Sequence, residues 1–164
     1  MIFPNIYDLS SHLSEKRKEN PELRVVLTCG GFDPVHIGHL RCFQDSVRIK
    51  DSMPEDCIFV IVANADGFLI NKKGKVFMPE NERLEILHGF KGVDYVTSWY
   101  DGTQNCIGAL EILRPNIFTK GGDRTSRENI PESEVCDKIG CDIVLGVGGG
   151  KIQSSSWLTG ESQN

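Results

Sequence analysis

The chain has 164 residues, of which 39% are hydrophobic and 25% are charged, and this length fits one globular domain that buries its own core. A formal net charge of -5 argues against bulk association with nucleic acid or an anionic membrane, because both partners need a basic surface. An anionic ligand must therefore be held by a local cluster of basic residues.

The first residues and the cysteines do not indicate a targeting segment, a membrane span or a disulfide framework. The first ten residues contain Asp8 and lack a basic start followed by an apolar run, and no stretch approaches membrane-spanning length. We therefore expect a cytoplasmic protein without a membrane partner. The six cysteines form no CxxC pair, which favours free thiols over a zinc site or a disulfide framework.

Residues 1–21 are predicted to form an N-terminal helical appendage that serves packing or a dimer contact. Its helix spans Ile6–Lys18, with Leu9 and Leu13 on one face, and ends at Asn20-Pro21. The rest of the chain alternates apolar, β-rich runs with segments able to form helices. The predicted strands are Val25–Thr28, Ile58–Ala63, Tyr95–Ser98, Ile117–Thr119 and Ile143–Val147. The predicted helices are Ile37–Ile49, Pro79–His88, Gln104–Leu113, Glu132–Lys138 and a short one that opens near Ser154.

This alternation indicates an α/β fold in which a five-stranded parallel sheet carries helices on both faces. No internal repeat or linker divides the chain, so residues 1–164 are expected to form a single domain. The polar residues 159–164 are expected to fray.

The end of the first predicted strand has the features of an anion-binding corner. Gly30 and Gly31 permit a tight turn and a close approach of the backbone to a ligand. The helix that follows offers unpaired N–H groups and the positive end of its dipole. His36 and His39 lie three residues apart, so both rings can donate to the same phosphate. An isolated pair with this spacing would more often be structural or at the surface, but the strand-to-helix setting favours ligand binding, and no recognisable third ligand supports a metal site.

The segment G-G-F-D-P-V-H-I-G-H at residues 30–39 resembles the HIGH signature of the cytidylyltransferase-like nucleotidyltransferases. The resemblance extends over roughly Val25 to Leu158 and implies a Rossmann-like sheet in which the two histidines stabilise the transition state. It also implies a nucleotide site at Gly30, Gly31, Phe32 and Asp33. Class I aminoacyl-tRNA synthetases share the signature, but this chain lacks a KMSKS segment and room for their anticodon-binding parts.

A basic loop follows the second predicted strand. Its lysines are Lys72, Lys73 and Lys75, and mobile ammonium groups on a glycine-containing loop can close over phosphates. A solvated surface loop is the alternative, but the family places a triphosphate-binding lysine here. Arg83 corresponds to the arginine of the family's ExR pattern. Its guanidinium is expected either to pair with phosphates or to lock the lysine loop through Glu80 or a main-chain carbonyl.

Two later segments complete the predicted site. Lys120, Gly121, Gly122 and Asp123 are similar to a Lys-Gly-Gly-Asp turn of bacterial heptose-phosphate adenylyltransferases, although an ordinary glycine turn with a capping aspartate is the alternative. Residues 151–156 align with the family's final Ser/Thr-rich motif, in which hydroxyl groups and helix amides hold phosphates. The serines concerned are Ser154, Ser155 and Ser156, which simple helix capping would also explain.

These residues predict a nucleotidyltransferase that joins the nucleoside monophosphate of an NTP to a phosphorylated small metabolite, such as a sugar phosphate, and releases pyrophosphate. ATP is favoured, because Val147 to Gly150 stand where glycerol- and choline-type cytidylyltransferases carry an Arg-Thr pair. His36, His39, Lys72 and Lys75 are the expected catalytic residues, with Mg²⁺ carried by the triphosphate. A CTP-dependent enzyme and a non-catalytic nucleotide-binding module are the alternatives. A homodimer without a nucleic-acid partner is expected.

Overall fold

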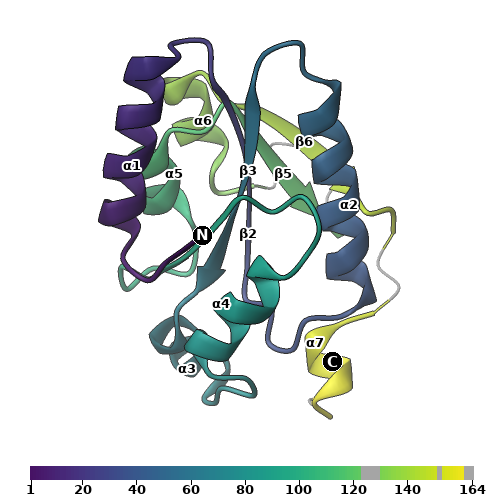
Figure 1. Cartoon of the computed structure of the whole chain (residues 1–164). Coiled ribbons are helices and arrows are strands. Elements are labelled where there is room, and N and C mark those ends of the chain that lie inside the picture. Colours follow the sequence, from purple (N-terminus) through teal and green to yellow (C-terminus); the bar gives the residue numbers. More distant parts are fainter. Residues whose placement is uncertain (123–129, 151–152, 161–164) are drawn as a thin grey trace.

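A computed structural model describes residues 1–122, 130–150 and 153–160. Six parallel strands form one sheet in the order β1-β4-β3-β2-β5-β6 (Figure 1). The strands are β1 (Ile2–Phe3), β2 (Arg24–Gly30), β3 (Cys57–Asn64), β4 (Tyr95–Trp99), β5 (Ile117–Gly121) and β6 (Asp142–Val147). The helices are α1 (Ile6–Glu19), α2 (Ile37–Ser52), α3 (Asp66–Lys73), α4 (Glu80–His88), α5 (Ile107–Leu113), α6 (Ser133–Ile139) and α7 (Ser155–Leu158).

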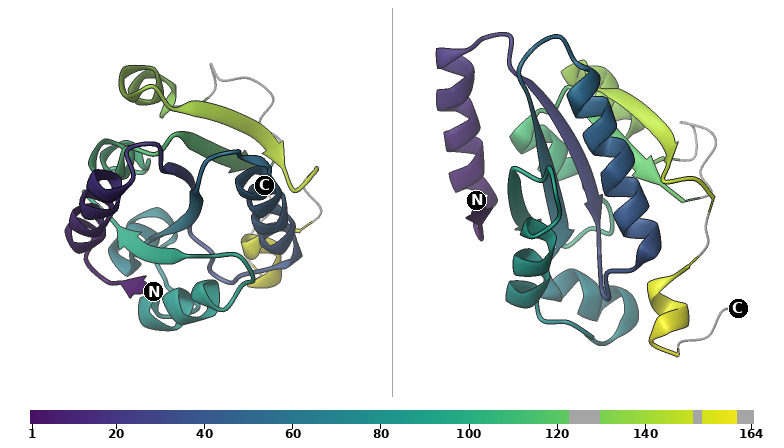
Figure 2. Two further views of the ribbon diagram at one scale, coloured as in Figure 1. Left: turned by 45° about the horizontal axis from the view of Figure 1, so that its top comes forward. Right: turned by 45° about the vertical axis from the view of Figure 1, so that its right-hand side comes forward.

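Helices cover both faces of the sheet, which confirms the predicted α/β, Rossmann-like class (Figure 2). Helices α1, α5 and α6 bury one face, and the core there includes Leu27, Val60 and Phe118 from the strands. Helices α2 and α4 bury the other face, where Val26, Phe59 and Ile61 are fully enclosed. Because the central strands β2 and β3 are buried on both sides, their sequences are nearly continuous apolar runs rather than alternating ones.

The predicted strand count of five was one too low. Strand β1 has only two residues and pairs with β4, Ile2 beside Val96 and Phe3 beside Thr97. A two-residue strand has no periodicity that a sequence can reveal. The N-terminal segment is consequently part of the sheet and its helical layer: Leu9 and Leu13 of α1 are fully buried, and α1 packs on α5 and β4. Of the two roles expected for this segment, packing is the one that this geometry displays.

The basic segment after β3 was expected to be a loop, but most of it is helix α3, which includes Lys72 and Lys73 in its last turn. Gly74 ends this helix in the left-handed conformation, with φ of +78°. Gly67 at the second position of the helix and Gly74 directly after it are both typical of a loop, which is why the sequence did not predict α3. No helix in residues 1–122, 130–150 and 153–160 combines the length and apolarity needed to cross a bilayer.

Candidate active site

A cavity of about 930 Å³ opens where β2, β5 and β6 end and α2 begins. Strands β3 and β4 are added to one side of β2, and β5 and β6 to the other, so the strand order reverses at β2. Ligands of open α/β sheets bind at such a switch point. All predicted site residues that the structure describes line this cavity, except Lys75 and Arg83. The volume is in the range of small-molecule sites.

His36 and His39 are fixed by the first turn of α2. His36 is the N-cap, and its Nδ1 accepts a hydrogen bond from the Gly38 N–H at 3.0 Å. The Nδ1 atom of His39 accepts from the His36 N–H at 3.1 Å, which completes a reciprocal capping box. In a neutral histidine whose Nδ1 is an acceptor, the proton is on Nε2. Both rings therefore have the tautomer that can donate to a phosphoryl oxygen.

Burial and the neighbouring His36 ring keep His39 neutral. Its ring stacks on His36 with 3.8 Å between the centroids, and it also contacts the Phe32 ring edge to face. Burial, and secondarily repulsion from His36 when that ring is protonated, lower the pKa of His39 from 6.5 to about 3. A protonated His39 would place an unpaired charge in this enclosed position. The ring is thus suited to hydrogen-bond donation rather than to carrying a fixed positive charge.

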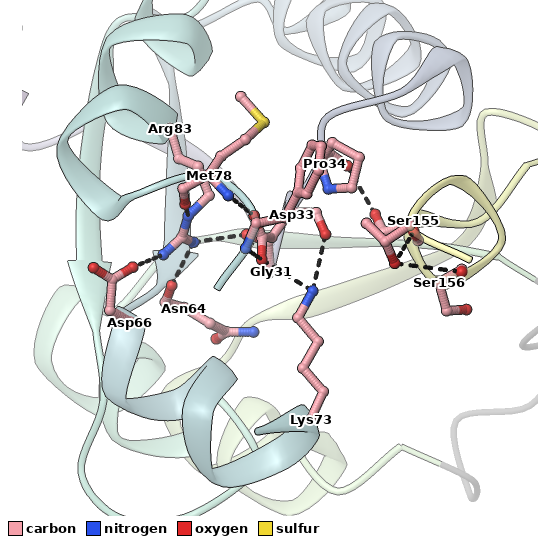
Figure 3. Close-up of polar contacts among 12 residues, drawn as sticks. Gly31, Asp33, Pro34, Asn64, Asp66, Lys73, Met78, Arg83, Ser155 and Ser156 are labelled. Carbon is pink, nitrogen blue, oxygen red and sulfur yellow. Dashed lines mark hydrogen bonds and ion pairs between the residues drawn. The ribbon is translucent and has the colours of Figure 1, made fainter. Parts of the chain in front are cut away.

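Asp33 and Lys73 join the glycine corner to the segment after α3. The Asp33 carboxylate is 1% exposed, and it accepts hydrogen bonds from the backbone N–H groups of Phe77 and Met78. Lys73 Nζ lies 2.9 Å from Asp33 Oδ2 and donates to the Asp33 carbonyl at 3.0 Å (Figure 3). Burial raises the pKa of Asp33, but the hydrogen bonds from Phe77, Lys73 and Met78 outweigh it, and the pKa is lowered overall.

Arg83 does not line the cavity; it is buried beneath the site and hydrogen-bonds to the segments around it. Its side chain is fully buried, and Nη1 donates to the carbonyls of Gly31 at 2.7 Å and Asn64 at 2.6 Å (Figure 3). Nε donates to the Met78 carbonyl at 2.9 Å, and Nη2 to Asp66 Oδ1 at 2.8 Å. Pairing with phosphates, one of the two roles expected for Arg83, does not fit this enclosure. The bond to Met78 matches the other role, a lock on the segment that follows the lysines.

The remaining lysines differ in position. Lys72 is exposed and lines the cavity, with its Nζ 5.9 Å from the centroid of the Phe68 ring. Lys120, at the end of β5, also lines the cavity, with its Nζ 5.6 Å from the centroid of the Phe118 ring. Lys75 lies after α3 and is not a lining residue. Lys72 and Lys120 therefore approach the cavity from different elements, the last turn of α3 and the end of β5.

The closing serines lie at the start of α7. Ser155 Oγ donates to the Pro34 carbonyl at 2.8 Å, so it attaches α7 to the glycine corner (Figure 3). The hydroxyl groups of Ser154 and Ser156 are 2.8 Å apart, and all three serines line the cavity. Asp123, Lys151 and Ile152, which belong to the predicted motifs, lie outside the described residues.

Sequence analysis missed the contribution of the glycine loop, which we define as Gly148–Gly150. These three residues follow β6 directly and line the cavity. The run of glycines was visible, but it served only to show that the Arg-Thr pair of the cytidylyltransferases is absent, and no ligand contact was assigned to it. Cys42, on the second turn of α2, is another lining residue that no pattern indicated.

The described side chains that line the cavity do not form a metal-coordinating group. Within the described ranges, no three His, Cys, Asp or Glu side chains are grouped so that they could hold a metal ion. Asp33 is the carboxylate among the described lining residues, and Lys73 and two amides already engage it. A magnesium ion would therefore fit this site through the oxygens of a bound triphosphate.

A parallel sheet with a glycine corner and paired histidines at its switch point defines a Rossmann-like nucleotide-binding class. Residues 27–152 match the family model described as cytidylyltransferase-like. The chain is 33% identical over 128 residues to the bifunctional protein HldE of Hahella chejuensis, covering 77% of this chain and 23% of the relative. It is 32% identical over 151 residues to the protein of the same name from Syntrophotalea carbinolica, covering 87% and 27%. The chain thus spans about a quarter of the length of these curated relatives.

A crystal structure of a lipopolysaccharide core biosynthesis protein from Thermoplasma volcanium GSS1 has the same fold. Its TM-score is 0.57 at 24% identity, and the match covers 75% of this chain and 93% of that one. The chain belongs to the cytidylyltransferase-like family. The cytidylyltransferase-like family expected from the sequence is confirmed.

Proposed function

We propose that the chain transfers the nucleoside monophosphate of ATP to a phosphorylated sugar and releases pyrophosphate. The observation that carries this proposal is that the Nδ1 atoms of both histidines accept backbone N–H groups within one cavity. Their Nε2 protons are then available to a phosphoryl oxygen. A pair of neutral donors at a helix N-terminus is suited to a phosphate that gains negative charge during reaction.

The reaction needs no activated side-chain nucleophile. A phosphate monoester is largely dianionic near neutral pH, so its oxygen can attack the α-phosphorus in line while the bond to pyrophosphate breaks. His36 and His39 donate to the oxygens of the reacting phosphorus. Lys72 and the hydroxyl groups of Ser154 and Ser156 hold the departing β- and γ-phosphates, while Ser155 keeps α7 attached to Pro34. Lys75 follows Gly74, where it can approach on closure. Mg²⁺ bound to the triphosphate would neutralise further charge.

The choice of base and acceptor rests on separate arguments. ATP is favoured because the glycine loop stands where the glycerol- and choline-type cytidylyltransferases carry an Arg-Thr pair. A sugar phosphate is favoured by the Lys-Gly-Gly-Asp turn at residues 120–123 and by similarity to the HldE proteins. Heptose 1-phosphate is accordingly the first acceptor to test.

The decisive experiment is a matrix of ATP, CTP, GTP and UTP against phosphorylated sugars and alcohols, with pyrophosphate release as the readout. We expect release with ATP and a sugar phosphate. Preference for CTP would instead support the cytidylyltransferase alternative. Tight nucleotide binding without turnover on any acceptor would support the non-catalytic module and contradict the proposal.

Substitution of the histidines tests the mechanism in the same assay. His36→Ala and His39→Ala are expected to lower kcat by about 100-fold, the usual effect of removing one preorganised donor. His88→Ala is the matched control, because His88 is exposed on α4 and does not line the cavity. Full activity in both cavity variants would refute the assigned roles.

A single domain, a homodimer and a cytoplasmic location stay predictions, and light scattering of the purified chain tests the dimer.

A further inference from the structure

The glycine loop is pressed against helix α2 at the end of β6. Gly148 has φ of +82°, and a Cβ atom added there would lie 2.8 Å from the Cys42 backbone nitrogen and 3.1 Å from its Cα. Gly149 has φ of +80° and donates its N–H to the Gly146 carbonyl at 3.2 Å. The backbone of the loop can reach α2 this closely only because residue 148 has no side chain.

A single carboxylate on α2 holds the loop at this position. Asp45 Oδ2 accepts a hydrogen bond from the Gly148 N–H at 2.6 Å, across 103 residues of sequence. Hydrogen bonds of an ionised acceptor are roughly twice as strong as neutral ones. The other carboxylate oxygen pairs with Arg48, three residues further along the helix. That pair is largely exposed and contributes little by itself.

Asp45 therefore links two parts of the cavity through one rigid element. The N-terminal turn of α2 carries His36 and His39, and the middle of the same helix anchors the glycine loop on another side of the cavity. Gly121 belongs to the same contact, because a Cβ atom there would lie 3.4 Å from the Val147 carbonyl and 3.6 Å from Cys42 Sγ. The distance between histidines and loop depends on this docking.

We propose that Asp45 is a positioning residue for the nucleotide site: it docks the glycine loop in the conformation that binds the NTP. This inference rests on the proposed function, since it assigns the loop to the nucleotide subsite. If the docked conformation becomes less populated, the apparent affinity for the nucleotide falls by the same factor. The histidines and their hydrogen bonds are unaffected, so the chemical step is preserved.

The test compares Asp45→Ala, Asp45→Asn and Asp51→Ala with the wild-type chain. Asp51 is the matched control, an exposed aspartate near the end of the same helix. Asn at position 45 keeps an oxygen that can accept from the Gly148 N–H, but it has no charge. Two quantities are measured below the melting temperature of every variant. They are hydrogen exchange of the Gly146–Gly150 amides and the kinetic constants for the NTP.

We expect Asp45→Ala to accelerate exchange of the loop amides and to raise the KM for the NTP about tenfold with little change in kcat, the loss expected for one charge-assisted hydrogen bond. Asp45→Asn should recover most of both effects, and Asp51→Ala should match the wild type. Faster exchange without a change in KM, or an Asn variant as impaired as the Ala variant, would overturn the proposal. Failure of the wild-type chain to bind any NTP would overturn the proposed function instead, while the exchange data would still report on docking.

Discussion

At the scale of single residues, His39 has a measurable thermodynamic signature. Its pKa is about 3 in the folded chain and near 6.5 when exposed. Between these values the unfolded state binds a proton that the folded state does not, so stability falls as the pH falls below about 6.5. The contribution of His39 is complete above that pH.

The corresponding variant is His39→Gln, which keeps an acceptor for the capping box but does not titrate. From pH 7 to pH 5, we expect the wild-type free energy of unfolding to fall by about 2 kcal/mol more than that of the variant. Urea denaturation at the two pH values measures this difference. Parallel losses in the two proteins would mean that His39 is protonated in the folded state.

The adjacent lysines at positions 72 and 73 provide a second contrast between residues. Lys73→Met leaves the buried Asp33 carboxylate without its cation, and we expect a loss of about 2 kcal/mol in stability. Lys72→Met removes an exposed ammonium group at the cavity, so we expect stability within about 0.5 kcal/mol of wild type and a weaker affinity for the NTP. Urea denaturation and calorimetric titration of the nucleotide separate the two effects. The reverse pattern would assign the phosphate contact to Lys73.

At the scale of elements, Arg83 connects the ends of two strands with the loop before its own helix. Its four hydrogen bonds reach Gly31 after β2, Asn64 at the end of β3, Asp66 in α3 and Met78 before α4. Arg83→Met leaves the three carbonyls without this donor, whereas the Asp66 carboxylate is 41% exposed and can be hydrated. We expect a loss of about 3–5 kcal/mol in the free energy of unfolding, mainly from the carbonyls. Arg83→Lys should restore only part of it, because an ammonium group lacks the planar fork.

Chemical denaturation measures these losses, with Glu85→Met, an exposed position on the same helix, as the control. An Arg83→Met variant that kept wild-type stability and lost only nucleotide affinity would instead support a phosphate contact.

The elements also show what sequence patterns can predict. Strands β2 to β6 were found because each contains a β-rich run, which is long and apolar in β2 and β3, the strands buried on both faces. Strand β1 and helix α3 were missed, since β1 is defined by pairing with β4, more than ninety residues away, and α3 has a glycine at its second position and another directly after its lysines. The histidine corner was predictable because its residues are contiguous. The burial of Arg83 was not, because its acceptors come from separate loops that only the folded chain brings together.

At the scale of the whole molecule, the topology gathers the site at one edge of the sheet. The ends of β2, β5 and β6 meet the start of α2 there, so segments from both halves of the chain line one cavity. Ser155 attaches α7 to Pro34, and Asp45 attaches the glycine loop to α2. A nucleotide that bridges these segments would add contacts that exist only in the folded state, and it should stabilise the chain as a unit.

We therefore expect MgATP at 100 times its Kd to stabilise the chain by about 2.7 kcal/mol, which corresponds to a rise of about 5–10 °C in Tm for a domain of this size. Adenosine is the control, because it lacks the phosphates that the histidine corner, Lys72 and the serines are proposed to hold. At equal concentration, it should give a much smaller shift. Differential scanning calorimetry of the wild-type chain measures both values. Equal shifts with MgATP and adenosine would place the binding energy on the base, and the phosphate site derived from the histidine corner would then be wrong.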